Sequence, residues 1–404
     1  MFSHEVQIGD LVVGQNHPVR IMGVINLSPE SFYGESVAQS ENDLKGAVNE
    51  MTRAGVDIID IGGASTAPEA IYGARETSLE KELERVVWAM EILKAITEIP
   101  FSIDTTSSKI AEAALDMGAV LVNDVSGLQQ DDRMVDVVST RRVPAVLMAH
   151  CKPSCNSLDD SMTSLRKSMD IALKGGIDRS RVVLDPGIGF GKPPEADLRL
   201  LRELGRFSIL RQPILVGLSR KAFIGAVLEQ EDPHDRLIGT IAATTIAVAN
   251  GASIIRAHDV KEAKLAAKMG EAVRKHRTQA NDNVILLDIQ DEKESEIAIE
   301  QLGAQSTIKK FLSRKSITLN FLIQNASPPA ALIIKQEMLS LGGDAAYHHD
   351  TIDFGIDRTD ILVMGTLLQI RRLVKKLSGM KYFGLEGIAT SMRVILEERE
   401  EKLG

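Results

Sequence analysis

Eight short apolar segments, each with polar or charged residues at or shortly after its end, constrain the fold of this chain more than any other feature. The segments are Ile21–Ile25, Ile58–Ile61, Phe101–Ile103, Val120–Val122, Val143–Leu147, Val182–Leu184, Ile214–Leu218 and Ser253–Ile255. Helices are expected between and after these segments. Two should begin near Glu41 and near Ser78, and the others should lie near Ser108–Met117, Asp131–Thr140, Leu158–Lys174, Glu195–Leu204, Pro233–Asn250 and Val260–Lys275. This alternation predicts an α/β fold, a parallel (β/α)8 TIM barrel, with an open doubly wound sheet as the alternative.

The polar residues after the apolar segments indicate a small-molecule site. In a parallel barrel the carboxyl ends of all strands meet at one mouth, so these side chains are expected to lie together. The candidates are Asn26, Thr66, Asp104, Asn123, Asp185, Ser219, Arg220, Lys221, Arg256 and His258. The loop from Asp185 to Lys192, rich in glycine, adds Phe190 and Lys192 and allows backbone amides to approach a ligand closely. An aspartate at a strand end also often caps the next helix, which is the alternative interpretation of Asp104.

Composition excludes several other classes of protein. The net charge of −9 and the pI near 5.5 argue against nucleic-acid binding, which normally needs a basic face. No apolar run is long enough to span a bilayer, and the polar start of the chain is unlike a signal sequence, so a cytoplasmic protein without a membrane partner is expected. Cys151 and Cys155 are too few for a disulfide framework, and with His150 they make an incomplete zinc site. We interpret the two cysteines as structural or incidental.

A second, smaller α/β domain is expected after the barrel. The barrel is predicted over residues 1–276, the polar segment 277–283 is predicted to be a linker, and residues 284–404 form the accessory domain. Its expected strands are Val284–Leu287, Thr318–Ile323, Ala345–His348 and Ile361–Met364, and its expected helices are Lys293–Leu302, Pro329–Leu341, Leu367–Leu377 and Leu385–Glu397. The run His348–Asp350 offers metal ligands, but adjacent histidines on a strand would point to opposite faces, so no metal site is predicted there.

The motifs at the strand ends resemble those of the dihydropteroate synthase family, whose members are pterin-binding TIM barrels. The resemblance covers about residues 17–276 and rests on Asn26–Phe32, Gly62–Pro68, Ser102–Thr105, Asn123–Val125, Leu184–Lys192, Ser219–Lys221 and Arg256–Val260. The stretch Lys335–Ala345 also resembles an accessory segment found in some long members of the family, for which we predict no chemistry.

The resemblance implies a reaction and a set of roles. The family joins 6-hydroxymethyl-7,8-dihydropterin diphosphate to an arylamine, usually 4-aminobenzoate, and releases diphosphate through an SN1-like cation. It implies that Asp104, Asp185 and Lys221 are catalytic. Asn26 is expected to bind a Mg²⁺ ion. The residues expected to bind substrate are Asn26, Thr66, Asn123, Phe190, Lys192, Ser219, Arg220, Arg256 and His258. The family usually dimerises through its last barrel helices, and Pro233–Asn250 is rich in small residues, so a homodimer is expected.

One departure from the family pattern bears on the amine substrate. The family typically has Arg after the Ser-Thr pair of the second loop, whereas this chain has Ala67. Loss of a guanidinium there removes a rigid donor fork, so another cation compensates or the amine differs. An archaeal-type reaction with a ribofuranosyl-aminobenzene phosphate, for methanopterin, therefore stays open. So do a pterin-dependent methyltransferase and a non-catalytic pterin-binding barrel.

Overall fold

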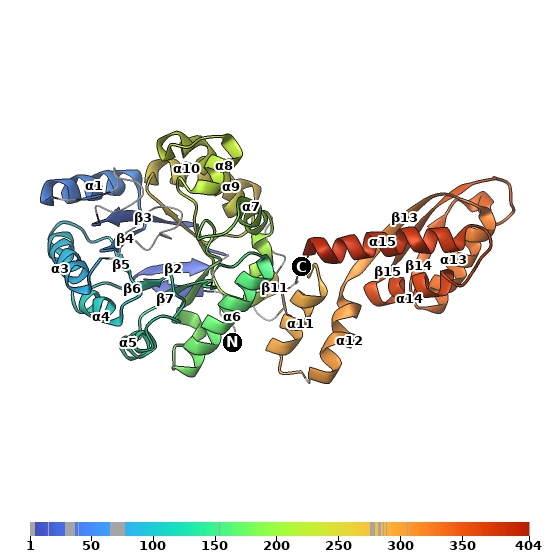
Figure 1. Cartoon of the computed structure of the whole chain (residues 1–404), viewed down its shortest axis with the longest axis horizontal. Helices are drawn as coiled ribbons and strands as arrows, with labels where there is room; N and C mark the ends of the chain where they lie inside the picture. Colours follow the sequence, from blue (N-terminus) through green and yellow to red (C-terminus); the bar gives the residue numbers. More distant parts are fainter. Residues whose placement is uncertain are drawn as a thin grey trace. The chain divides into compact units, whose positions relative to one another are not determined.

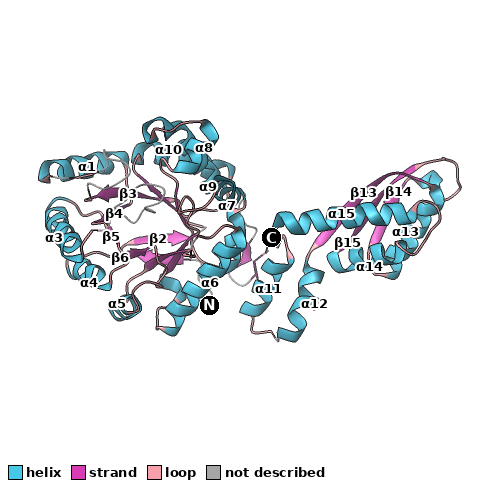
Figure 2. Ribbon diagram, viewed as in Figure 1, coloured by secondary structure: helices cyan, strands magenta, loops and turns pink. Residues whose placement is uncertain are grey.

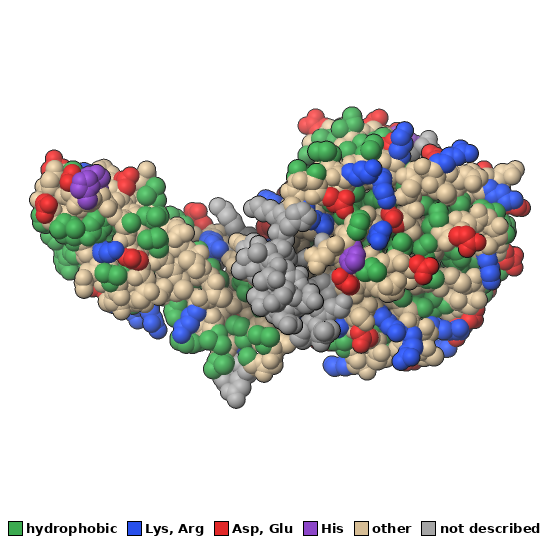
Figure 3. All heavy atoms as spheres, turned by 180° about the vertical axis from the view of Figure 1, so that it is seen from behind, with side chains coloured by type: hydrophobic (Ala, Val, Ile, Leu, Met, Phe, Trp, Pro, Cys, Tyr) green, Lys and Arg blue, Asp and Glu red, His purple; other side chains and the backbone are tan. Residues whose placement is uncertain are grey.

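The chain folds into two compact units, Met1–Arg277 and Thr278–Gly404 (Figure 1). The computed structural model describes every residue except 1–4, 15, 29–36, 39, 65–76, 153, 275–278, 282–283, 286, 288, 305 and 404. Among the described residues, no helix is both long enough and apolar enough to cross a bilayer. Acidic and basic side chains are interspersed on the face of the molecule that Figure 3 shows.

The first unit is built on eight parallel strands. They are β3 (Arg20–Asn26), β4 (Ile58–Gly62), β5 (Phe101–Asp104), β6 (Leu121–Asp124), β7 (Ala145–Met148), β8 (Val182–Asp185), β9 (Leu215–Gly217) and β10 (Ile254–Ala257). The pairing order is β8-β7-β6-β5-β4-β3-β10-β9, and a parallel bridge between Leu184 and Ile214 joins the two ends. The sheet is therefore closed, and the predicted (β/α)8 barrel is confirmed (Figure 2).

Helices on the outside of the barrel follow the strands. They are α1 (Glu41–Ala54), α3 (Leu79–Ile96), α4 (Ser108–Asp116), α5 (Arg133–Arg141), α6 (Leu158–Lys174), α7 (Pro194–Arg202), α8 (Ala222–Leu228), α9 (Leu237–Ala249) and α10 (Val260–Val273). Ser40 caps α1 through a capping box with Asp43. In α3 the cap is Ser78, so the helix begins at Leu79, close to the expected start. The short helix α8 was not predicted.

A hairpin that the sequence analysis missed packs against the amino end of the barrel. Strands β1 (Glu5–Ile8) and β2 (Leu11–Gly14) pair antiparallel. Their buried side chains Val6, Ile8 and Val13 join one core cluster with the barrel residues Met22, Ile58, Leu121, Val146, Val183, Leu215 and Ile254. This cluster identifies which strand residues point into the barrel.

The second unit contains a three-stranded antiparallel sheet in the order β13-β15-β14. Its strands are β13 (Thr318–Ala326), β14 (Asp344–Tyr347) and β15 (Thr359–Thr366). Its helices are α11 (Glu292–Gln301), α12 (Ser306–Ser316), α13 (Pro328–Ser340), α14 (Leu367–Leu377) and α15 (Leu385–Leu403). Residues of α13, α14, α15 and the sheet share one hydrophobic core. The sequence analysis missed α12.

Two further expectations about the second unit need correction. Part of the predicted linker is a strand, because β11 (Gln279–Asn281) pairs with β12 (Val284–Ile285). His348 and His349 do not lie on a strand, because β14 ends at Tyr347 and a 3-10 turn covers His349–Thr351. Their rings are 4.4 Å apart, and with Asp350 their ligand atoms lie within 4.8 Å of one another.

Candidate active site

The inward-facing side chains at the carboxyl end of the barrel form the candidate site. Side chains alternate across a strand, so residues two and four positions beyond the buried core layer also point inward. Steps of two from Met22, Ile58, Leu121, Val183 and Ile254 reach the carboxyl ends of their strands. The residues reached in this way are Asn26, Asp60, Asn123, Asp185 and Arg256. Asp104 joins them, because it is the register partner of Asn123.

Asp60 lies at the centre of a buried network and was not predicted. Its carboxylate accepts a hydrogen bond from Arg256 Nε at 2.6 Å, another from Asn123 Nδ2 at 3.1 Å and a third from Ser102 Oγ. Arg256 also donates from Nη2 to Asp104 Oδ2 at 2.7 Å. Arg256, on β10, is therefore fixed by carboxylates of β4 and β5. The available signal was a lone carboxylate two positions after Ile58 in an apolar strand.

The protonation equilibrium of Asp104 is strongly perturbed. Burial raises the pKa of Asp104 to about 7, the Arg256 cation opposes the rise, and the nearby negative charge of Asp60 adds to it. The carboxyl group therefore titrates near neutral pH, which is common among groups that act in catalysis.

The loop after β8 joins a second carboxylate to a lysine and an aromatic ring. Asp185 Oδ1 accepts a hydrogen bond from the backbone of Gly187 at 2.7 Å, and burial raises the pKa of Asp185. Lys221 donates to Ile188 O, and its Nζ lies 4.2 Å from the centroid of the Phe190 ring. Burial lowers the pKa of Lys221 to about 8, against the attraction of Asp185.

The same loop requires a glycine at position 189 and contains a second buried lysine, Lys192. Gly189 has φ of 80°, and a Cβ there would overlap the side chain of Lys221. Lys192 donates to Gly187 O and is buried, and burial lowers the pKa of its ammonium group. Lys192 is therefore not a solvated surface charge.

Ser219 and His258 meet at the ends of β9 and β10. The Oγ of Ser219 lies 3.0 Å from His258 Nδ1. Burial and the neighbouring cation of Arg256 lower the pKa of His258 to about 3, so its imidazole is neutral at pH 7.

Arg220 is held by the loops that surround it. Its guanidinium donates to both carboxylate oxygens of Asp259, at 2.8 and 2.9 Å, and to the carbonyl groups of Pro233 and His234. These bonds hold the loop after β9 against the loop after β10 and the loop before α9. In this structure Arg220 therefore stabilises the loop.

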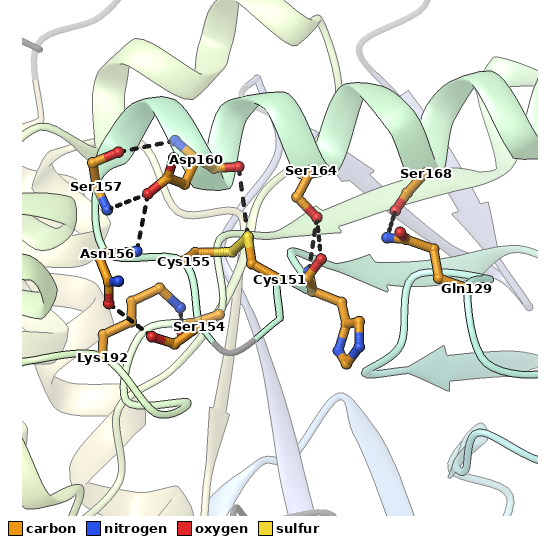
Figure 4. The surroundings of a disulfide bond; sticks show 12 residues. Gln129, Cys151, Ser154, Cys155, Asn156, Ser157, Asp160, Ser164, Ser168 and Lys192 are labelled. Carbon is orange, nitrogen blue, oxygen red and sulfur yellow. Dashed lines mark hydrogen bonds between the residues drawn. A yellow bond between two sulfur atoms is a disulfide. The ribbon is translucent and has the colours of Figure 1, made fainter.

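Thr66, a predicted substrate-binding residue, and Ala67, which stands where the family typically has Arg, lie outside the described residues. Cys151 and Cys155, in the loop between β7 and α6, form a disulfide that the sequence analysis did not expect (Figure 4).

Comparison with known proteins agrees with this arrangement. The model of the pterin binding enzyme family matches residues 22–258 of this chain. The dihydropteroate synthase of Synechocystis sp. is 36% identical over 285 residues, which cover 67% of this chain and 96% of that protein. The Bacillus subtilis dihydropteroate synthase is 37% identical over 256 residues, covering 63% of this chain and 88% of that protein.

Solved structures give the same result. Clostridium difficile dihydropteroate synthase, determined in the presence of pteroic acid, is 38% identical with a TM-score of 0.58 and covers 64% of this chain and 98% of its own. The Xanthomonas albilineans enzyme with 4-aminobenzoic acid is 34% identical with a TM-score of 0.60, covering 67% of this chain and 98% of its own. Fold and site thus define a pterin-binding barrel enzyme. Within that class, the chain belongs to the dihydropteroate synthase family.

Proposed function

We propose that this protein is a transferase that joins 6-hydroxymethyl-7,8-dihydropterin diphosphate to an arylamine and releases diphosphate, in folate biosynthesis. The observation that carries the proposal is the pair of buried carboxylates, Asp104 and Asp185, that share one barrel mouth with Lys221 and Arg256. Relatives that match this chain over most of their own length are named dihydropteroate synthase, after this activity.

The pterin ring fits the polar groups on the β6 and β8 side of the mouth. Asn123 uses its amide nitrogen on Asp60, and its Oδ1 accepts no hydrogen bond from any residue that the structure describes. Asp185 likewise uses Oδ1 on Gly187, and no described residue donates to its Oδ2. These two oxygens are acceptors for the amide-like N–H groups of a pterin edge, and Lys221 supplies a donor.

The same carboxylates support an SN1-like step. The carbon–oxygen bond to diphosphate breaks first, and the resulting pterin cation is stabilised by the negative charges of Asp104 and Asp185 in a buried environment. The amine nitrogen then attacks the exocyclic carbon and loses a proton. This chemistry depends on positioning and electrostatics rather than on a strong base.

Arg256 and His258 are proposed to hold the leaving diphosphate. The Nη1 group of Arg256 makes no hydrogen bond to any described residue, so it keeps donors for phosphate oxygens. The neutral His258 ring is linked to Ser219 through Nδ1.

Asn26 suits the Mg²⁺ that the family implies. It is the inward residue at the end of β3 and is paired in register with Gly62 at the end of β4. Mg²⁺ prefers oxygen ligands and is commonly held by few protein groups together with substrate phosphates, so one amide oxygen fits a metal that arrives with the diphosphate. Such an ion would neutralise charge on the leaving group.

The arylamine is proposed to bind beside Phe190, with Lys192, Ser219 and Thr66 contributing polar contacts. 4-Aminobenzoate is the expected amine. Ala67 favours a second candidate, a ribosylated aminobenzene phosphate, because the missing guanidinium leaves space for a bulkier aryl group.

A homodimer is proposed through α9 and α10. Of the small residues on α9, Ala243 and Ala247 are buried within the unit, whereas Ala242 is exposed. Further support comes from larger apolar side chains that recur at helical spacing on the exposed faces: Ile238 and Ile246 on α9, and Leu265, Met269 and Val273 on α10. Exposed apolar side chains on two helices that pack together are common at subunit interfaces.

A coupling assay tests the proposed function. Purified protein is incubated with the dihydropterin diphosphate, Mg²⁺ and either 4-aminobenzoate or a ribosylated aminobenzene phosphate, and diphosphate and pteroate-type product are both measured. Asp185→Asn is the inactive control. Diphosphate release coupled to product supports the proposal, whereas pterin binding without release with either amine indicates a binding barrel or a methyltransferase.

A further inference from the structure

The turn that carries Ser219 and Lys221 is built on a residue in an unfavourable backbone conformation. Arg220, between them, has φ of 57°, in the left-handed region that residues with a side chain seldom adopt. Such a conformation persists only where the surrounding structure imposes it, and it is most common at functional sites. The groups that hold Arg220 therefore also fix where its two neighbours lie.

Two residues near the start of α9 impose this conformation. Thr240 Oγ1 accepts a hydrogen bond from Arg220 N at 3.0 Å and donates one to Arg236 O at 2.9 Å. Arg236 Nη1 in turn donates to Arg220 O at 3.0 Å. Both backbone polar groups of Arg220 are thus held in a closed ring of three hydrogen bonds. We call Thr240 and Arg236 the Arg220 clamp.

The clamp acts through the backbone of the turn and not on a substrate. Thr240 is 5% exposed and Arg236 is 8% exposed. Besides Nη1, Arg236 donates from Nε to Gln230 O at 3.0 Å and from Nη2 to Glu231 O. All three of its guanidinium nitrogens therefore serve backbone carbonyl groups. In this way Arg236 joins the turn after β9 to the segment that follows α8.

We propose that Thr240 and Arg236 are positioning residues for the transfer reaction, because they hold the turn that presents Ser219 and Lys221 to the substrates. The proposal rests on the proposed function, which places Lys221 at the pterin and Ser219 beside the arylamine. Ser219 Oγ meets His258 Nδ1 at 3.0 Å, so a shift of the turn would also disturb the proposed diphosphate site. A reaction that depends on positioning is sensitive to displacements of about 1 Å.

Removal of one hydroxyl group tests the clamp. Thr240→Val keeps the shape of the side chain but leaves the Arg220 N–H without its partner, whereas Thr240→Ser keeps the hydroxyl. Thr245→Val is the matched control, because the Thr245 hydroxyl on the same helix donates to carbonyl groups of α9 and α10 and not to the turn. The measurements, all on the full chain, are hydrogen exchange of the segment 218–222, kcat and both KM values as a function of pH, and the melting temperature.

The alkaline limb of the pH profile separates positioning from a general loss of stability. Burial lowers the pKa of Lys221 to about 8. The carboxylates of Asp185 and Asp197 oppose this shift. The cations of Arg256 and Lys192 add to it. A loosened turn lets water reach the ammonium group, so its pKa rises toward the ordinary value and the alkaline limb of kcat/KM moves to higher pH.

We expect Thr240→Val to lower kcat/KM at least about tenfold and to speed exchange of the segment 218–222, with the alkaline limb at higher pH. Thr240→Ser should stay within about threefold of the unaltered protein, and Thr245→Val should change neither the exchange nor the pH profile.

A Thr240→Val protein whose kcat/KM stays within about twofold of the unaltered protein overturns the proposal. So does a loss of activity with an unmoved alkaline limb, which would reflect stability alone, and so does an equal loss in Thr240→Ser. An unaltered protein that releases no diphosphate with either amine would instead overturn the proposed function.

Discussion

Replacing Asp60 by Asn tests whether the buried network controls the site. The change keeps the shape of the side chain but removes its charge and one acceptor oxygen. The carboxylate of Asp60 accepts from Arg256, Asn123 and Ser102 and is fully buried. An asparagine has a single acceptor oxygen, so its amide group must face at least one donor of the network.

The expected loss of stability follows from this geometry. Removing one partner of a buried ion pair costs about 3–5 kcal/mol. Arg256 is 20% exposed and keeps its bond to Asp104, so we expect a smaller loss, of about 2 kcal/mol. For a domain of this size, that corresponds to a fall in melting temperature of roughly 4–8 °C.

The change should also affect Asp104 and Arg256. Without the negative charge of Asp60, one of the causes that raise the pKa of Asp104 disappears, so that pKa falls below about 7. Arg256 is then tethered only to Asp104, and diphosphate affinity should fall about tenfold.

The assay combines thermal unfolding, calorimetry with diphosphate and Mg²⁺, and the pH dependence of kcat/KM. Asp136→Asn, an exposed carboxylate on α5, is the control and should leave all three unchanged. A melting temperature within 1 °C of the unaltered protein together with unchanged diphosphate affinity would refute the reasoning.

Four further outcomes are expected. kcat/KM should be bell-shaped, falling below about pH 7 as Asp104 gains a proton and above about pH 8 as Lys221 loses one; a flat profile across this range contradicts these roles. Asp185→Asn should raise the pterin Kd at least about tenfold by calorimetry, with little change in melting temperature; equal affinity argues against the ring contact. Diphosphate should bind more tightly with Mg²⁺ than with EDTA, and equal calorimetric affinity in both counts against a metal-linked site. Met269→Lys should convert a dimer to a monomer by light scattering, whereas an unaltered protein that is already monomeric disproves the interface.

Much of the barrel could be predicted because its signals are local. The apolar segments from Ile21 to Ile255 and the capping box at Ser40 reflect burial and backbone capping, which depend on neighbours in sequence. Helix α6 has the predicted bounds Leu158–Lys174 for the same reason. The hairpin β1–β2 and helix α8 were missed because each is short and acquires its stability by packing on the barrel.

The candidate site was predicted in its residues but not in its connections. Asp104, Asn123, Asp185 and Arg256 were selected because each follows an apolar strand. That Asp60 joins Asn123 to Arg256 could not be read from the sequence, since the hydrogen bond between Arg256 and Asp60 spans 196 positions. The loop role of Arg220 depends in the same way on Asp259, 39 positions away.

The sequence by itself determined the fold class, the family and the chemical types of the residues at the barrel mouth, because strand period, turn chemistry and motif order are properties of short segments. Only the tertiary structure decided which charges meet. Closure of the barrel brings β10 beside β3 and carries Arg256 to the carboxylates of Asp60 and Asp104. Burial at that closed mouth then shifts the pKa values of Asp104 and Lys221 toward neutral pH, since desolvation depends on every element packed around a group.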